Sequence, residues 1–199
     1  MTLTVVPLST PNSITALSQA TLLNTDRLVL QTAQHPSAAW IVSSGIPYMS
    51  MDALYESSCD FDELNAAIAD KLTALALNFD VVYAVPGRGP GSALKRTLIH
   101  SARERGVALR FLPGSGYAEA AIAASGDVVS SGDIRIVEAS ALPCRIDPYV
   151  PLCVEEIDTV IRASEVKLAL SEYYPDDYGV FYAKMDQQGA YSVSAIALF

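Results

Sequence analysis

The sequence predicts a two-lobe α/β protein, with a parallel-sheet N-terminal lobe over residues 1–112, an α+β C-terminal lobe over residues 113–199, and a cleft between them. Up to Leu112, short strand-like runs alternate with segments of helical periodicity, which is typical of a parallel sheet. After Pro113 the strand-like runs group around helical segments instead. Hydrophobic residues make up 51% of the chain and charged residues 18%, enough to bury a sizeable core.

The N-terminal lobe contains the clearest single elements. Asp80–Val85 is a near-continuous apolar run, as expected for a strand buried within a parallel sheet. Asp60–Leu77 reads as a helix, because its apolar residues recur at three- and four-residue spacing and Asp60 can form a capping box with Glu63. The other expected elements are strands at Leu3–Val6 (closed by Pro7), Arg27–Leu30 and Val107–Leu112, and helices at Ser13–Leu23 and from about Ser92 to Arg105.

The C-terminal lobe is expected to combine paired strands with short helices. Gly179–Lys184 and Tyr191–Leu198 alternate like two paired strands. The remaining expected elements are a helix at Ala118–Ala124, strands at Asp133–Glu138 and Leu152–Glu155, and a helix at Ile157–Leu170.

Composition excludes several classes of protein. Thirteen Lys and Arg against 22 Asp and Glu give a net charge of −9, which argues against nucleic-acid binding. Three widely spaced cysteines without a CxxC pair support neither a disulfide framework nor a zinc site. The sequence MTLTVVPLSTPNS has no basic region before a long apolar run, and no apolar stretch approaches the roughly 20 residues of a membrane helix. We therefore expect a cytoplasmic protein that binds neither a membrane nor a metal.

Two glycine-containing loops are the candidate ligand site. Val82–Ser92 (VYAVPGRGPGS) reads as strand, loop and helix start, a context in which backbone N–H groups can face a ligand. It matches neither a Walker loop nor GxGxxG, and an ordinary tight connection explains it about equally well. Pro113–Tyr117 (PGSGY) is a second such loop, and two loops at adjacent strand ends would face one crevice. Taken alone, this second loop also reads as a simple turn before a helix.

Basic side chains and one histidine are the candidates for substrate binding. Residues 88–110 contain six Lys or Arg against a single acid, so Arg88, Lys95 and Arg96 could bind an anionic ligand. A solvated helix face is the commoner explanation for such a cluster. His35 precedes Pro36. Ser115 does not lie in a GxSxG motif, and no sequence pattern pairs it with His35. No nucleophilic triad is therefore indicated, and the catalytic residues stay unassigned.

Three segments carry a resemblance to a known family. These are VYAVPG at Val82–Gly87, RFLPGSG at Arg110–Gly116 and QTAQHPSAAW at Gln31–Trp40. In their order and spacing they resemble the tetrapyrrole (corrin/porphyrin) methylases, and more narrowly the methylase-like domain at the N-terminus of MazG-type nucleotide pyrophosphohydrolases. Weaker similarity extends over nearly the whole chain.

The resemblance implies a class III methyltransferase of tetrapyrrole methylase-like fold, which binds S-adenosylmethionine between its lobes and often forms homodimers. The implied cofactor-binding residues are Pro86, Gly87, Arg88, Gly89, Pro113, Gly114, Ser115, Gly116, Tyr117, Ala139, Ser140 and Ala141. His35, Arg88 and Arg96 are the candidates for the acceptor. That acceptor stays open among a tetrapyrrole, a peptide and a nucleotide-related compound. Methyl transfer requires alignment and exclusion of water, and no metal.

The chain departs from the family at two loops. Where the family has a GxGPGD-type loop after the first strand, Pro7–Asn12 contains no glycine, and Gly87-Arg88-Gly89-Pro90 replaces a Gly-His-Pro sequence. No ExxE and ExxD pair is present to form a pyrophosphohydrolase site. These departures favour an alternative, a degenerate non-catalytic domain that binds a ligand or regulates a partner.

Overall fold

The computed structural model describes residues 1–126, 133–157 and 159–198. Its contacts divide the chain into two compact units. Unit 1 is Met1–Gly116 together with Gln187–Ala190, and unit 2 is Tyr117–Asp186 together with Tyr191–Phe199. The division falls after Gly116, whereas the sequence pattern suggested Leu112, and a four-residue turn late in the chain returns to unit 1.

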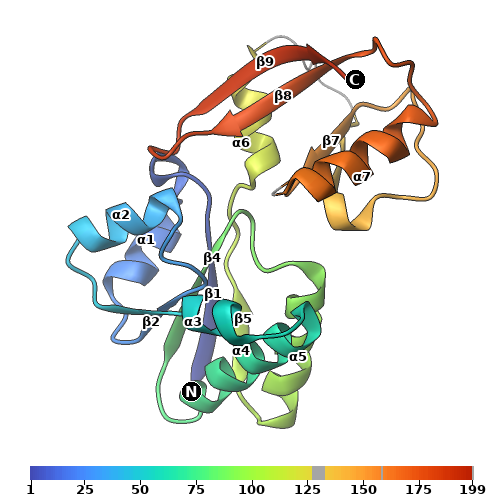
Figure 1. Ribbon diagram of the computed structural model, residues 1–199. Helices are drawn as coiled ribbons and strands as arrows, with labels where there is room; N and C mark the ends of the chain where they lie inside the picture. The colour runs from blue at the N-terminus through green and yellow to red at the C-terminus, as the bar shows by residue number, and fades with distance from the viewer. Residues whose placement is uncertain (127–132, 158, 199) are drawn as a thin grey trace. The chain divides into compact units, whose positions relative to one another are not determined.

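Unit 1 is built on a five-stranded sheet with the order β3-β2-β4-β1-β5, and all its strand pairs are parallel (Figure 1). The predicted parallel α/β sheet is therefore confirmed. The strands are β1 (Thr2–Leu8), β2 (Leu28–Leu30), β3 (Tyr48–Ser50), β4 (Val81–Pro86) and β5 (Ala108–Phe111).

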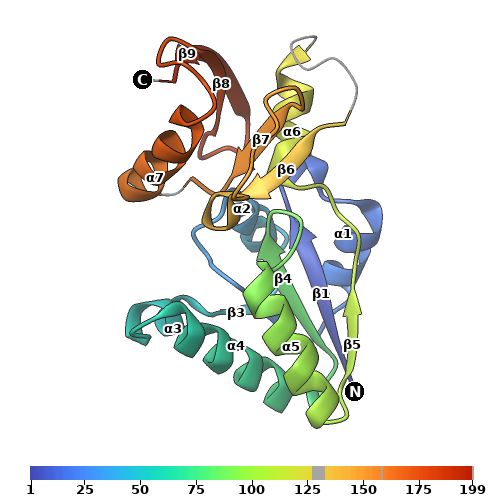
Figure 2. The same ribbon diagram turned by 90° about the vertical axis from the view of Figure 1, so that its right-hand side faces the viewer.

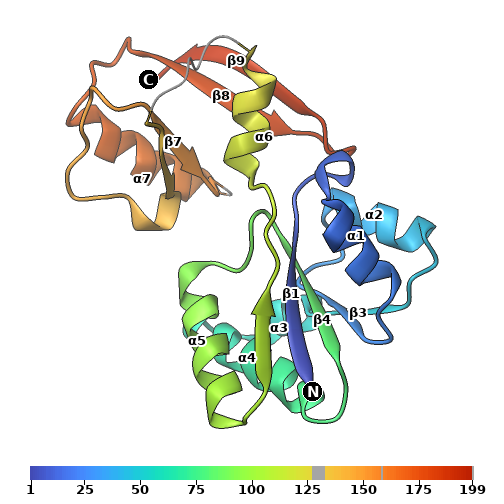
Figure 3. The same ribbon diagram turned by 180° about the vertical axis from the view of Figure 1, so that it is seen from behind.

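Helices cover both faces of this sheet, as Figures 1 and 3 show from opposite sides. On one face α3 (Asp52–Ser57), α4 (Phe61–Ala76) and α5 (Ser92–Glu104) pack over a core that includes Leu3 and Tyr83. On the other, α1 (Ala16–Leu23) and α2 (Pro36–Ser43) enclose a second core. Burial of β4 on both faces explains why its sequence is continuously apolar.

The start of α4 confirms Asp60 as the N-cap residue and half of the expected capping box. The Asp60 carboxylate accepts a hydrogen bond from the Glu63 N–H at 2.8 Å, which satisfies an N–H group that the first helical turn leaves without a partner. The Glu63 carboxylate accepts a hydrogen bond at 2.8 Å from the N–H of Cys59, one residue before the N-cap.

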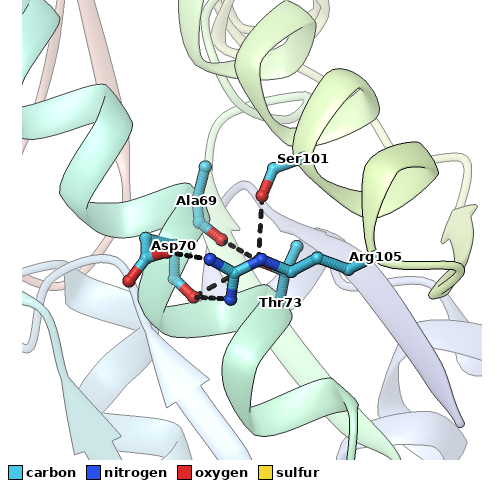
Figure 4. A network of polar contacts seen from close by, with 5 residues as sticks. All are labelled: Ala69, Asp70, Thr73, Ser101 and Arg105. Atoms are coloured by element: carbon cyan, nitrogen blue, oxygen red, sulfur yellow. Dashed lines mark hydrogen bonds and ion pairs between the residues drawn. The ribbon is translucent and has the colours of Figure 1, made fainter.

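Polar contacts join α4 to the end of α5 (Figure 4). The fully buried Thr73 hydroxyl donates to the Ala69 carbonyl at 2.7 Å and lies 3.0 Å from the Ser101 hydroxyl. Arg105 forms an ion pair with Asp70 and also donates to the Asp70 carbonyl at 3.4 Å. The pair of helices is therefore fixed by side chains as well as by its apolar contacts.

Strand β1 continues through Pro7, although Pro7 was expected to end it. The Val5 carbonyl accepts the Leu112 N–H at 2.9 Å, so Val5 and, two residues on, Pro7 direct their backbone polar groups toward β5. Pairing with β5 ends at Phe111, opposite Val5. The missing N–H of Pro7 therefore costs no strand pairing.

Unit 2 contains two separate two-stranded sheets. Strands β6 (Arg135–Glu138) and β7 (Leu152–Glu155) are parallel, whereas β8 (Gly179–Met185) and β9 (Tyr191–Ala197) form the expected antiparallel pair. Helix α6 (Tyr117–Ala124) packs against β7 and β9. Helix α7 (Val160–Ser171) starts later than the Ile157 expected from sequence, because Thr159 caps it; residue 158 lies outside the described residues.

Candidate functional site at the carboxyl edge of the sheet

The loops that follow β4, β1 and β5 lie at one edge of the unit 1 sheet (Figure 2). The sequence placed the β4 and β5 loops at adjacent strand ends, and this is wrong, because β1 runs between the two strands. On this part of the edge three loops therefore lie side by side, and the middle one is Pro7–Asn12, the segment that lacks glycine. Ligands of open α/β sheets bind at this kind of edge.

The β4–α5 loop turns on glycines in conformations that other residues rarely adopt. Gly87 has φ 67° and Gly89 has φ 142°. No atom lies within 4 Å of the place where a Cβ on Gly89 would stand. Gly91 caps α5 without a side-chain hydrogen bond, so the N–H groups of the first turn have no side-chain cap. This loop can present its backbone closely to a polar ligand.

The β1 loop follows a path that needs no glycine. Thr10 and Ser13 form a reciprocal cap around the short 3₁₀-helix η1 (Pro11–Ser13), with the Thr10 N–H donating to the Ser13 hydroxyl at 3.0 Å. Among the described residues other than glycine, only Glu156 has a positive φ. The backbone of this loop is thus occupied by its own side chains and does not form a glycine cradle.

The β5 loop packs directly on β1. A Cβ on Gly114 would stand 2.3 Å from Pro7 Cγ, so only glycine fits at this position. Two hydroxyl oxygens at this edge, Ser9 Oγ and Ser115 Oγ, are buried and have no hydrogen-bond partner in the structure. Such groups are rare in folded proteins, so these two hydroxyls are available to a bound ligand or water. The sequence pattern gives no signal for Ser9, because small polar residues are common in loops.

The implied cofactor residues fall into both units. Pro86–Gly89 and Pro113–Gly116 lie at the carboxyl edge in unit 1. Tyr117 begins α6 in unit 2, and Ala139–Ala141 form the 3₁₀-helix η3, with Ala139 buried. The structure therefore brings the first two segments together along one sheet edge.

His35 has a structural role at the start of α2. It is the N-cap residue, and its Nδ1 accepts a hydrogen bond from the Ser37 N–H at 3.2 Å. Burial lowers the pKa of His35 to about 4, so the ring is neutral near pH 7. The Ser37 hydroxyl donates to the Ser9 carbonyl at 3.3 Å and so ties α2 to the β1 loop.

Asp52 is a further charged group near this segment that the sequence analysis did not identify. Its carboxylate accepts a hydrogen bond from the Ala33 N–H at 3.0 Å. Partial burial raises the pKa of Asp52, but hydrogen bonds from Ala33, Thr32 and Ser50 outweigh it and hold the pKa below its ordinary value. The group is thus ionised at neutral pH.

Of the basic residues proposed for an anionic ligand, Arg88 and Arg96 are exposed. The Lys95 ammonium lies 5.1 Å from the centre of the Phe111 ring.

Within residues 1–126, 133–157 and 159–198 there is no group of three or more His, Cys, Asp or Glu side chains that could hold a metal ion. None of the described helices is both long and apolar enough to cross a membrane.

Comparison with solved structures defines the class of fold. The chain aligns over 100% of its length with the uroporphyrin-III C-methyltransferase of Thermus thermophilus in complex with S-adenosylhomocysteine, with a TM-score of 0.70 and 14% identity, covering 89% of that chain. It also matches the methyltransferase CobJ (TM-score 0.66, 17% identity, 99% and 86% of the two chains) and diphthine synthase (0.63, 12%, 100% and 82%). The protein thus has the α/β fold of the tetrapyrrole methylases.

Among curated proteins, the chain is 30% identical over 165 residues to the uncharacterized protein YabN of Bacillus subtilis (strain 168). The match covers 80% of this chain and 33% of YabN, so the chain spans about a third of the length of that relative. No protein-family model matches the chain.

Proposed function

We propose that this protein is an S-adenosylmethionine-dependent methyltransferase of the tetrapyrrole methylase type, acting on an unidentified acceptor. The observation that carries the proposal is the carboxyl edge of the unit 1 sheet, where Gly87 and Gly89 have positive φ and Gly114 packs against Pro7 with no room for a side chain. The likeness to a methyltransferase solved with S-adenosylhomocysteine supports the same assignment.

The residues at this edge fit a polar, nucleoside-containing cofactor. Open space at Gly89 allows close approach to the backbone, and Ser115 offers a buried hydroxyl without a partner. We assign contact with the cofactor to Pro86–Gly89 and Pro113–Gly116 in unit 1, and to Tyr117 and Ala139–Ala141 in unit 2. When bound, S-adenosylmethionine supplies an electrophilic methyl group on a sulfonium. The protein's task is to align the acceptor with it and to exclude water, for which neither a metal nor a covalent nucleophile is needed.

Calorimetric titration with S-adenosylmethionine and S-adenosylhomocysteine tests the proposal. We expect binding by the wild type and by Gly106→Ala, and loss of binding in Gly89→Ala. Both glycines have positive φ (142° at Gly89 and 66° at Gly106) and open surroundings, but Gly106 ends α5 at the opposite edge of the sheet. The Gly106 variant therefore controls for the addition of a methyl group at a positive-φ glycine away from the cofactor loops. Absence of binding of either compound at millimolar concentration would refute the proposal.

A second candidate is a degenerate domain that binds a ligand or regulates a partner without catalysis. The capped turn formed by Thr10 and Ser13 favours it, because that turn stands where the family would place its first glycine loop. This candidate predicts that S-adenosylhomocysteine binds without methyl transfer to any acceptor, or that neither cofactor binds. Transfer of a labelled methyl group to any compound in a cell extract would eliminate it.

We further propose that the domain is of the kind associated with MazG-type pyrophosphohydrolases, and that it forms homodimers. The resemblance of Val82–Gly87, Arg110–Gly116 and Gln31–Trp40 to such domains supports the first proposal. The second is supported by the exposed apolar side chains of unit 2, among them Val160, Ile161 and Leu168 on α7. Light scattering coupled to size exclusion tests the dimer, and nucleotide hydrolysis by complexes captured from cells tests the association.

A further inference from the structure

A groove along α2 shares no lining residue with the proposed cofactor loops. It has a volume of about 530 Å³ and is lined by residues of the β2–α2 connection, of one face of α2 and of the turn after β8. The lining residues are Ala33, Gln34, His35, Pro36, Ala38, Ala39, Val42, Ser43 and Gln187. All of them belong to unit 1, and none belongs to Pro86–Gly89, Pro113–Tyr117 or Ala139–Ala141. The volume is within the usual range for small-molecule sites.

The lining contains hydrogen-bonding groups but no charged side chain. Two carboxamides (Gln34 and Gln187), one hydroxyl (Ser43) and the imidazole of His35 stand among alanine, proline and valine side chains. The imidazole is neutral near pH 7 because burial lowers its pKa to about 4. An anion in this groove would meet no countercharge among the lining side chains.

The surroundings of the groove also disfavour anions. The Asp52 carboxylate accepts a hydrogen bond at 3.0 Å from the N–H of Ala33, one of the lining residues. The chain as a whole carries a net charge of −9. A carboxylate or phosphate would therefore meet negative charge both close by and at long range.

We propose that this groove binds an uncharged small molecule that presents a flat ring to the alanine face of α2 and an amide or similar group to Gln34 and Gln187. In the proposed methyltransferase this ligand is the acceptor, and that part of the inference rests on the proposed function. It directs the search for the acceptor toward neutral, amide-bearing compounds and away from polycarboxylates.

Two pairs of probes test the site without any cofactor: nicotinamide against nicotinate, and benzamide against benzoate. Each pair differs only in an amide or a carboxylate. The chain has two histidines, so imidazole signals in ¹H–¹³C NMR spectra report His35 directly, with His100 on the exposed face of α5 as internal reference. We expect the amides to shift the His35 signals and to bind at least about tenfold more tightly than the acids.

A charge variant keeps the inference falsifiable. Ala39 is exposed on α2, so Ala39→Lys should fold and place a cation in the groove; it should reverse the preference toward nicotinate. Ala66→Lys, at an exposed site on α4, adds the same charge elsewhere and should leave the preference unchanged. The proposal would be overturned by any of three results: His35 signals that do not move, equal affinity for amide and acid, or the same shift in preference in both lysine variants. Failure of S-adenosylmethionine to bind would refute the methyltransferase function and leave the groove intact.

Discussion

The contact between Gly114 and Pro7 allows a sharp test of how the β5 loop is held. In Gly114→Ala the new Cβ would stand 2.3 Å from Pro7 Cγ and 2.9 Å from Pro7 Cβ, whereas carbon atoms in contact are separated by about 3.5–4.0 Å. The proline ring cannot turn away, because it is closed onto a backbone that pairs with β4 up to Leu8. The loop must therefore move, and we expect a loss of about 1–3 kcal/mol in the free energy of unfolding.

A double-mutant cycle assigns this loss to the contact. Pro7→Ala removes the nearest atom, so Gly114→Ala should cost at least about 1 kcal/mol less in the Pro7→Ala background than in the wild type. Urea unfolding followed by the fluorescence of Trp40, the single tryptophan, reports unit 1, since Trp40 packs on the core beneath α1 and α2. Additive effects of the two substitutions, or a Gly114→Ala protein as stable as wild type, would refute the reasoning.

Three further predictions rest on other parts of unit 1. Because the pKa of His35 is lowered to about 4 in the folded protein, the unfolded chain binds this proton first, and the free energy of unfolding should fall as the pH drops from 6.5 toward about 4. In His35→Asn, which retains an N-cap acceptor, the free energy of unfolding should depend less on pH over this range in denaturant titrations at a series of pH values. Thr73→Val should lower the free energy of unfolding by about 1–2 kcal/mol in thermal or urea unfolding, because the buried hydrogen-bond network loses its hydroxyl. Asp70→Asn should lower it by less than about 1 kcal/mol, since the ion pair of Asp70 is exposed. Equal losses in the two variants would contradict this. Gly189→Ala should loosen the turn at Gln187–Ala190, because the new Cβ would stand 2.6 Å from Pro11 Cδ. Gly106→Ala is the control, since it has similar backbone strain but open space around the new Cβ. We expect faster amide hydrogen exchange at the turn in Gly189→Ala only.

The sequence predicted the parallel α/β character of unit 1 because periodicity and burial are local signals. The long apolar run at β4 and the capping box at Asp60 identified two elements that the structure contains. Strand order is not a local signal, and so the position of β1 between β4 and β5 was missed. Helix α2 was also missed, since its N-cap is a histidine, which is outside the usual set of capping residues.

The candidate site could be predicted only in part. Glycines at 87 and 89 signal positive φ, and the structure has them there. By contrast, the requirement for glycine at 114 comes from Pro7, a residue far away in sequence, and the buried hydroxyls of Ser9 and Ser115 depend on tertiary packing. No local sequence pattern encodes the contacts between strands. These contacts decide which loop hydroxyls become buried without a hydrogen-bond partner.

The position of β1 between β4 and β5 has a consequence for synthesis of the protein. Thr2–Leu8 leaves the ribosome before its two neighbours in the sheet, Val81–Pro86 and Ala108–Phe111. At roughly 5–20 residues per second, this apolar strand must wait for β4 while about 80 further residues are added, and for β5 while about 100 are added. During those seconds its open edges can pair with other chains, and the wide separation of its contacts slows the final folding step. Nascent chains of this protein are thus most vulnerable to aggregation, and most dependent on chaperones, until β5 has emerged.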